Sequence, residues 1–184
     1  LPDQFNNPNG APSLNPDGST FSPSNPFGGN ANPGGWVVGD GQFLDFLIPN
    51  YNQQLVKQIW VVIKFSTPSA GVGVPFGTIL GTDGSPGVQI NAPTISPVPG
   101  VPNLSEVAYL YEMPTCWTFN LTIRFPIGIP SSAGYIDQVY VATRCIPTPG
   151  AAGITLGVEP NSRPLSTRVC PVLYSPRMLI PQST

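Results

Sequence analysis

The segment Cys116-Trp117-Thr118-Phe119-Asn120-Leu121-Thr122-Ile123-Arg124-Phe125 alternates apolar and polar residues along its whole length. Successive side chains of a β-strand point to opposite faces of the sheet, so this pattern predicts a strand with one buried face. The side chains predicted to face the core are those of Trp117, Phe119, Leu121, Ile123 and Phe125.

A second strand is predicted from Tyr135 to Arg144, after a connector that runs from Pro126 to Gly134. This strand is β-branched and aromatic, and it is apolar on both faces. That pattern indicates a central strand with other parts of the protein covering each side. We expect the two strands to form an antiparallel hairpin. Its register stays open, because a slip of one residue would exchange the faces.

The three cysteines, Cys116, Cys145 and Cys170, contain no CxxC spacing, which favours one disulfide and one spare thiol over a metal site. The hairpin register that sets Cys116 opposite Cys145 makes these two the disulfide candidates. It also sets Arg124 opposite Asp137. A Cys116–Cys145 bridge would close a loop of roughly 30 residues and contribute on the order of 3 to 4 kcal/mol. Pairing of Cys116 with Cys170, or a free Cys116, is the alternative.

The composition predicts an ordered, loop-rich β protein. At 184 residues the chain fits one domain, and it combines 25 prolines and 20 glycines with 40% hydrophobic and only 9% charged residues. Further strands are predicted at residues 36–38, 43–48, 58–65, 78–80, 88–90, 105–112, 154–158, 168–174 and 177–180. Many short strands without a confident helix indicate an all-β fold, a single β-sandwich or jelly-roll domain.

Both ends of the chain are predicted to be extended, proline-rich arms. Residues 1–34 form the N-terminal arm, 35–157 the β-sandwich domain and 158–184 the C-terminal arm. The N-terminal arm is either flexible or docked in grooves of its own or a neighbouring subunit. The apolar anchors for docking are Phe5, Leu14, Phe21 and Phe27 in the first arm and Val172, Tyr174, Leu179 and Ile180 in the second.

Charge and residue content count against several functions. The net charge is −2 with seven scattered basic residues, so we expect no nucleic-acid partner. No histidine is present to act as a general base or zinc ligand. Glu106 and Glu112 share one face of a predicted strand but lie about 20 Å apart, too far for a catalytic pair. We therefore expect no enzyme activity and no cofactor.

Three further features concern ligands, modification and export. Asp17, Asp40 and Asp83 occupy glycine-flanked turns, which favours turn formation over calcium binding. Asn103 and Asn120 begin glycosylation sequons, with Asn120 in mid-strand. No run is long enough to span a bilayer. A chain that begins Leu-Pro-Asp is expected to be a mature product whose leader has been removed, and hence secreted or at the cell surface.

Several short motifs resemble those of uncharacterised secreted β-sandwich proteins of environmental bacteria, some of which end in a PEP-CTERM sorting tail. The motifs are Asn6-Asn7-Pro8, Gly34-Gly35-Trp36, Gly39-Asp40-Gly41, Gln58-Ile59-Trp60-Val61 and Ile136-Asp137-Gln138-Val139-Tyr140-Val141, followed by Thr143-Arg144-Cys145-Ile146-Pro147. The resemblance spans residues 34–147 and implies a secreted β-sandwich. The arm 158–184 stands where such proteins would carry a sorting tail, so the resemblance does not extend to anchoring.

These observations predict an extracellular structural protein, a self-assembling subunit of a filament or surface layer held together by inter-subunit strand addition. The first alternative is a secreted carbohydrate-binding β-sandwich module, which would need exposed aromatic residues on one sheet face. The second alternative is a jelly-roll component of a viral capsid or spike. Most aromatic side chains are expected in the core, namely those of Trp36, Trp60, Trp117, Tyr51, Tyr109, Tyr111, Tyr135 and Tyr140.

Overall fold

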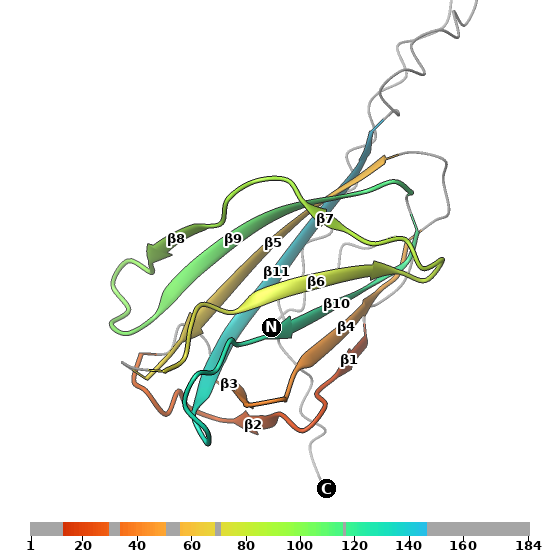
Figure 1. The fold of residues 1–184 in the computed structure, drawn as a ribbon. Coiled ribbons are helices and arrows are strands. Elements are labelled where there is room, and N and C mark those ends of the chain that lie inside the picture. Colours follow the sequence, from red (N-terminus) through yellow and green to blue (C-terminus); the bar gives the residue numbers. More distant parts are fainter. Residues whose placement is uncertain (1–12, 30–33, 51–55, 69–70, 116, 147–184) are drawn as a thin grey trace, which may run out of the picture.

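A computed structural model of the chain describes residues 13–29, 34–50, 56–68, 71–115 and 117–146. Within these residues the protein is all-β: two antiparallel sheets pack face to face as a β-sandwich and no helix is present (Figure 1). The predicted fold class is therefore confirmed. None of the described residues forms a helix that could cross a membrane.

The smaller sheet has four strands in the order β1-β4-β10-β6, and every neighbouring pair is antiparallel. Its strands are β1 (Ser13–Asn15), β4 (Leu44–Ile48), β10 (Phe119–Arg124) and β6 (Phe76–Gly81). The alternation of β10 places Phe119, Leu121 and Ile123 in the core, fully buried, as the sequence predicted. Phe125 is buried as well, whereas Trp117 precedes the strand and is half-buried.

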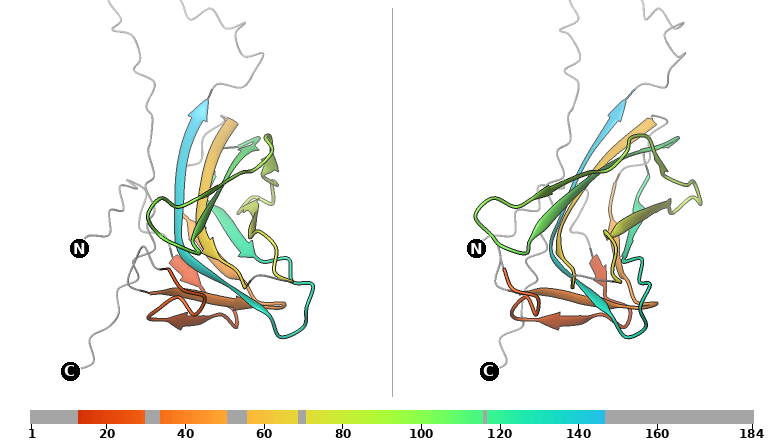
Figure 2. Two further views of the ribbon diagram at one scale, coloured as in Figure 1. Left: turned by 90° about the vertical axis from the view of Figure 1, so that its left-hand side faces the viewer. Right: turned by 60° about the vertical axis from the view of Figure 1, so that its left-hand side comes forward.

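The larger sheet has seven strands in the order β2-β3-β11-β5-β9, with β7 and β8 both paired to the outer side of β9. Its strands are β2 (Thr20–Ser22), β3 (Gly35–Gly39), β11 (Ala133–Ile146), β5 (Val56–Ser66), β9 (Ser105–Met113), β7 (Val88–Gln89) and β8 (Thr94–Pro97). The long strands β11, β5 and β9 form its centre, and Figure 2 shows them curving across the smaller sheet.

The core between the sheets is aliphatic and aromatic, with one fully buried cation. Lys57 takes the core-facing position at the start of β5, and its Nζ donates to the carbonyl of Trp117 at 3.0 Å. The same amine lies 4.3 Å from the centre of the Phe119 ring. A buried ammonium group is tolerated only where such partners replace water, so Lys57 ties the end of β5 to the segment that enters β10.

The predicted hairpin between the two central strands is wrong. β10 pairs with β4 and β6, whereas β11 pairs with β3 and β5 in the other sheet. The connector 126–134 thus crosses from one sheet to the other, and the apolar side chains of β10 and β11 meet across the core. Arg124 does not face Asp137: its guanidinium lies 4.9 Å from the Phe43 ring, while Asp137 is buried beside a β-bulge in β11.

Part of the stretch predicted as an N-terminal arm forms strands of the sandwich. β1 pairs with β4 and β2 pairs with β3, so residues 13–22 reach both sheets at one side of the molecule (Figure 1). Leu14 packs against the core, and the Phe21 ring lies edge-on to Trp36 at 5.7 Å. Residues 1–12 and 147–184, which include the predicted C-terminal arm, lie outside the described residues.

Candidate functional site

The outer face of the larger sheet carries polar and aromatic side chains on its three long strands. Cross-strand register places Gln138 beside Lys64 and Lys64 beside Glu106, which forms one row across β11, β5 and β9. In the next row Tyr140 lies beside Val62. These side chains are only half-buried, because alternation along each strand directs them away from the core.

A shallow hollow of about 340 Å³ lies over these two rows, lined by Val62, Lys64, Glu106, Gln138 and Tyr140. Its apolar part is the Tyr140 ring and the short Val62 side chain. Its polar part combines a cation, a carboxylate and an amide. The prediction that Trp60 and Tyr140 belong to the core is wrong: both lie on this outer face, half-buried, because the strands are apolar on both faces and alternate residues must point outward.

A hydrogen-bonded network of side chains lies at the opposite end of the same face, near the end of β11. Arg144 Nε donates to Gln58 Oε1 at 2.6 Å, and Gln58 Nε2 donates to Glu112 Oε1 at 2.6 Å. The Arg144 guanidinium also stacks 4.8 Å from the centre of the Trp60 ring. The chain thus joins β11, β5 and β9 through their outward side chains and covers one side of the indole.

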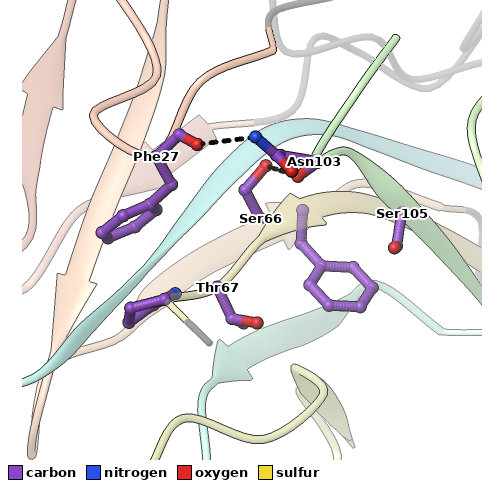
Figure 3. Close-up of a pocket in the computed structure, with 7 residues that line it drawn as sticks. Phe27, Ser66, Thr67, Asn103 and Ser105 are labelled. Carbon is purple, nitrogen blue, oxygen red and sulfur yellow. Dashed lines mark hydrogen bonds between the residues drawn. The ribbon is translucent and has the colours of Figure 1, made fainter. Parts of the chain in front are cut away.

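A second pocket, of about 540 Å³, opens at one end of the sandwich (Figure 3). It contains no charged residue and is lined by Phe27, Phe65, Ser66, Thr67, Pro68, Asn103 and Ser105. Asn103 Nδ2 donates to the Phe27 carbonyl at 3.2 Å, and the Ser66 hydroxyl donates to the Asn103 carbonyl. These two bonds connect the loop after β2 with the end of β5 and the segment before β9.

Asn25 anchors the loop behind this pocket. Its side chain is buried, and Nδ2 lies within hydrogen-bonding distance of the carbonyls of Gly28 and Gly29 at 2.9 and 2.6 Å and of Ser66 Oγ at 2.7 Å. Its Oδ1 accepts from the Phe27 amide at 2.9 Å. Gly29 has a φ of 79°, and a Cβ there would come 1.7 Å from the Pro102 carbonyl oxygen, so the loop needs glycine to pack this closely.

The side of the sandwich formed by β6, β7 and β8, here called the β6–β8 side, is apolar and almost uncharged. Residues 65–105 contain a single charged residue, Asp83. Five large apolar side chains on this side are exposed: Phe76 38%, Leu80 50%, Val88 59%, Ile90 45% and Ile95 52%. β7 and β8 form the outer edge of the larger sheet, and β6 forms the edge of the smaller one (Figure 1).

Two tyrosines of β9 bond to the β6 edge from across the core. Tyr111 donates its hydroxyl to the Gly77 carbonyl at 2.8 Å, and Tyr109 donates to the Pro75 carbonyl at 2.6 Å. Burial raises the pKa of both hydroxyl groups above their usual range, so both stay protonated and able to donate. Carbonyls at the edge of the smaller sheet are thereby satisfied within the molecule.

Asp83 organises the turn that joins β6 to β7. Its Oδ1 accepts from the Ser85 amide at 2.9 Å, and its Oδ2 accepts from the Thr115 hydroxyl at 2.9 Å. The hydrogen bonds from Ser85 lower the pKa of this carboxyl group. The arrangement is an Asx-type turn. In the part of the chain that the structure describes, no three His, Cys, Asp or Glu side chains gather in a group that could hold a metal ion.

The remaining predicted site residues are dispersed. Asn103 is exposed in a loop with a φ of 60°, whereas Asn120 is half-buried on the outer face of β10, between Leu47 and Leu80. The predicted anchors Leu14, Phe21 and Phe27 contact their own sandwich, as described above. The anchors Phe5, Val172, Tyr174, Leu179 and Ile180 lie outside the described residues.

The predicted disulfide likewise stays a prediction. Cys116 and Cys170 lie outside the described residues. Cys145 is half-buried near the end of β11 and has an interaction partner.

No family model, curated protein or solved structure matches the chain. The resemblance to secreted bacterial β-sandwich proteins therefore stays a prediction.

Proposed function

We propose that the protein is an extracellular structural subunit that assembles with copies of itself through the β6–β8 side. The observation that supports this most directly is that the sheet edges on this side carry exposed apolar side chains and lack charge. Soluble proteins usually protect the free edges of their sheets with charged side chains, above all lysine, or with very short strands. Between Lys64 and Glu106 the chain has a single charged residue, Asp83, which lies in a turn.

Covering this edge with a second copy of the chain would be more favourable than leaving its apolar side chains in water. Val88, Ile90 and Ile95 are each about half exposed, and covering them would remove apolar surface from water at roughly 25 cal/mol per Å². A two-fold contact between identical edges would set the same apolar residues against each other. The proposed partner is a copy of this chain, which would make the product a homo-oligomer.

Backbone pairing adds a limited contribution to this contact. Pro93 and Pro97 bound the stretch of β8 that has amide groups to offer, so strand addition there can involve only Thr94, Ile95 and Ser96. Apolar side chains thus contribute most of the association. The arms predicted at residues 1–34 and 158–184 would extend such a contact into a filament or surface layer. Low charge and abundant proline suit a durable extracellular surface.

Sedimentation velocity of the full-length chain over a range of concentrations tests the proposal. We expect reversible self-association of the unaltered protein, and a shift to monomer in Ile95→Lys and Val88→Lys, because each substitution places a charge in the edge. Thr20→Lys is the matched control. Thr20 is exposed on β2, at the opposite edge of the larger sheet from β7 and β8, and its substitution should leave association unchanged.

Two results would reject this interface. The unaltered chain could remain monomeric at its highest soluble concentration, or Thr20→Lys could reduce association as much as Ile95→Lys does. Thermal unfolding of each variant shows whether its sandwich is intact.

A further inference from the structure

We propose that the hollow on the outer face of the larger sheet binds a sugar residue of a neutral oligosaccharide. The inference rests on the side chains of β5, β9 and β11 and is independent of self-association at the β6–β8 side. A pyranose ring offers an apolar face of C–H groups and a rim of hydroxyl groups. The hollow offers a surface for each.

The apolar surface consists of Tyr140 and Val62. These residues lie opposite each other on β11 and β5, and both are half-buried, so the phenol ring stands beside a short side chain. Trp60 occupies the next row, but the Arg144 guanidinium already lies 4.8 Å from its ring centre. Tyr140 is therefore the aromatic ring that a sugar can stack against in this hollow.

The polar surface lies one row further along the strands. Lys64 and Glu106 lie opposite each other on β5 and β9, with Gln138 next to Lys64 on β11. An ammonium group donates hydrogen bonds and a carboxylate accepts them, so adjacent sugar hydroxyl groups find both kinds of partner in one row. A hydrocarbon ligand would displace water from these polar groups without offering them hydrogen bonds and would bind poorly.

The balance of charge excludes strongly ionic ligands. Lys64 lies beside Glu106 at one end of the face, and Arg144 connects through Gln58 to Glu112 at the other. An anion or a cation would meet a like charge next to each opposite one. A neutral polyhydroxylated ligand meets no such repulsion.

The lining also lies on rigid elements. All five residues belong to β5, β9 and β11, which pair along most of their lengths, so their spacing is fixed before a ligand arrives. A volume of about 340 Å³ is within the range of small-ligand sites and suits one or two sugar rings. Preorganised side chains reduce the entropy lost on binding.

Titration of the full-length protein with neutral hexasaccharides tests the proposal. The probes are cellohexaose, laminarihexaose, mannohexaose and chitohexaose, followed by calorimetry and by backbone amide NMR. We expect at least one to bind and to shift the amides of Val62, Lys64 and Tyr140. Tyr140→Ala should weaken that binding about tenfold, the loss expected for one stacked ring, and Tyr140→Phe should largely retain it. Glu106→Gln should weaken it less than Tyr140→Ala does.

Ile95→Lys is the matched control, because it alters the β6–β8 side and should leave sugar binding unchanged. The proposal is overturned if no probe binds, or if Tyr140→Ala binds as tightly as the unaltered chain while retaining its thermal unfolding transition. It is also overturned if the Tyr140 ring resists a soluble paramagnetic agent before any sugar is added, since the face would then already be covered.

Discussion

The two sides of the sandwich where the sheets end are built in opposite ways. At one side lie β1 and β2, three residues each, with polar exposed residues such as Ser13, Asn15 and Thr20. At the other lies the β6–β8 side, where the exposed residues include five large apolar ones. Each of the two sheets has one edge on each side.

The difference shows two ways of treating a sheet edge. β1 and β2 are too short to present a long template to another strand. Of their apolar residues, Leu14 packs against the core, and Phe21 lies edge-on to Trp36 although it is 37% exposed. On the β6–β8 side, tyrosine hydroxyls bond the carbonyls of Gly77 in β6 and of Pro75 just before it, but apolar side chains of β7 and β8 remain in solvent. The apolar residues of the first side contact other residues of the same chain, whereas those of the second side are available to a partner.

The largest effect is expected from Asn25→Ala, behind the β1–β2 side. The substitution removes a buried amide whose nitrogen lies within hydrogen-bonding distance of three acceptors and whose oxygen accepts from the Phe27 amide, and we expect a loss of about 2 to 3 kcal/mol in unfolding free energy. Asn91 is the matched residue at the other side, where its Oδ1 accepts from the Leu110 amide at 2.9 Å while exposed. Asn91→Ala should cost about 0.5 kcal/mol, because water replaces the lost bond. Equal losses in urea unfolding would contradict the comparison.

Tyr111→Phe should cost about 1 to 2 kcal/mol, because it leaves the Gly77 carbonyl at the β6 edge without its donor. Tyr140→Phe is the control, because Tyr140 is a half-buried residue on the outer face, and the expected change is near zero. Both variants are compared by chemical unfolding. If Tyr111→Phe unfolds at the same denaturant concentration as the unaltered chain, the hydroxyl does not stabilise this edge.

Stability should decline at alkaline pH. Burial raises the native pKa of Tyr109 and Tyr111 above the ordinary value of 10.0, and burial with the nearby Asp137 raises that of Tyr135 to about 12. Below pH 10 neither state has lost these protons, so the contribution is intact. Above pH 10 the unfolded chain releases them first, and the free energy of unfolding falls as pH rises toward the native values. Thermal unfolding between pH 8 and pH 12 should show this decline, and the double variant of Tyr109 and Tyr111 to Phe should show less of it.

The smallest effect concerns salt. Because Asp83 is the one charged residue in 65–105, self-association through the β6–β8 side should change less than about twofold between about 0.05 M and about 0.5 M sodium chloride. Sedimentation at both concentrations measures it. A steep loss of association with salt would point to a charged interface elsewhere on the molecule.

Local pattern predicted which residues are buried, but not which sheet a strand joins. The alternation of 119–125 identified Phe119, Leu121 and Ile123 as core residues, since the period of a strand fixes its two faces. The predicted hairpin is wrong because a nine-residue connector can either turn back within one sheet or cross to the other sheet. Both arrangements bury the same side chains. Only the packing of the whole chain decides between them.

The candidate surfaces were harder to predict than the core. The sequence predicts Trp60 and Tyr140 in the core because their strands are apolar on both faces, but this pattern also occurs where an outer face is half exposed. Val88 and Ile95 are exposed because, among the described residues, only the short strands β7 and β8 pair with the outer side of β9 and no further strand covers them. The scarcity of charge in residues 65–105 is a signal within the sequence that could have indicated this edge.

That same scarcity of charge affects how proteases meet the protein. No lysine or arginine lies between Lys64 and Arg124, so an enzyme that cuts after basic residues has no site in β6, β7, β8 or β9. Trypsin would release residues 65–124 as one large fragment even from the unfolded chain. Within the subunits of an assembly, the stretch that contains the β6–β8 side would therefore stay uncut by this class of enzymes through its covalent sequence, before folding adds any protection.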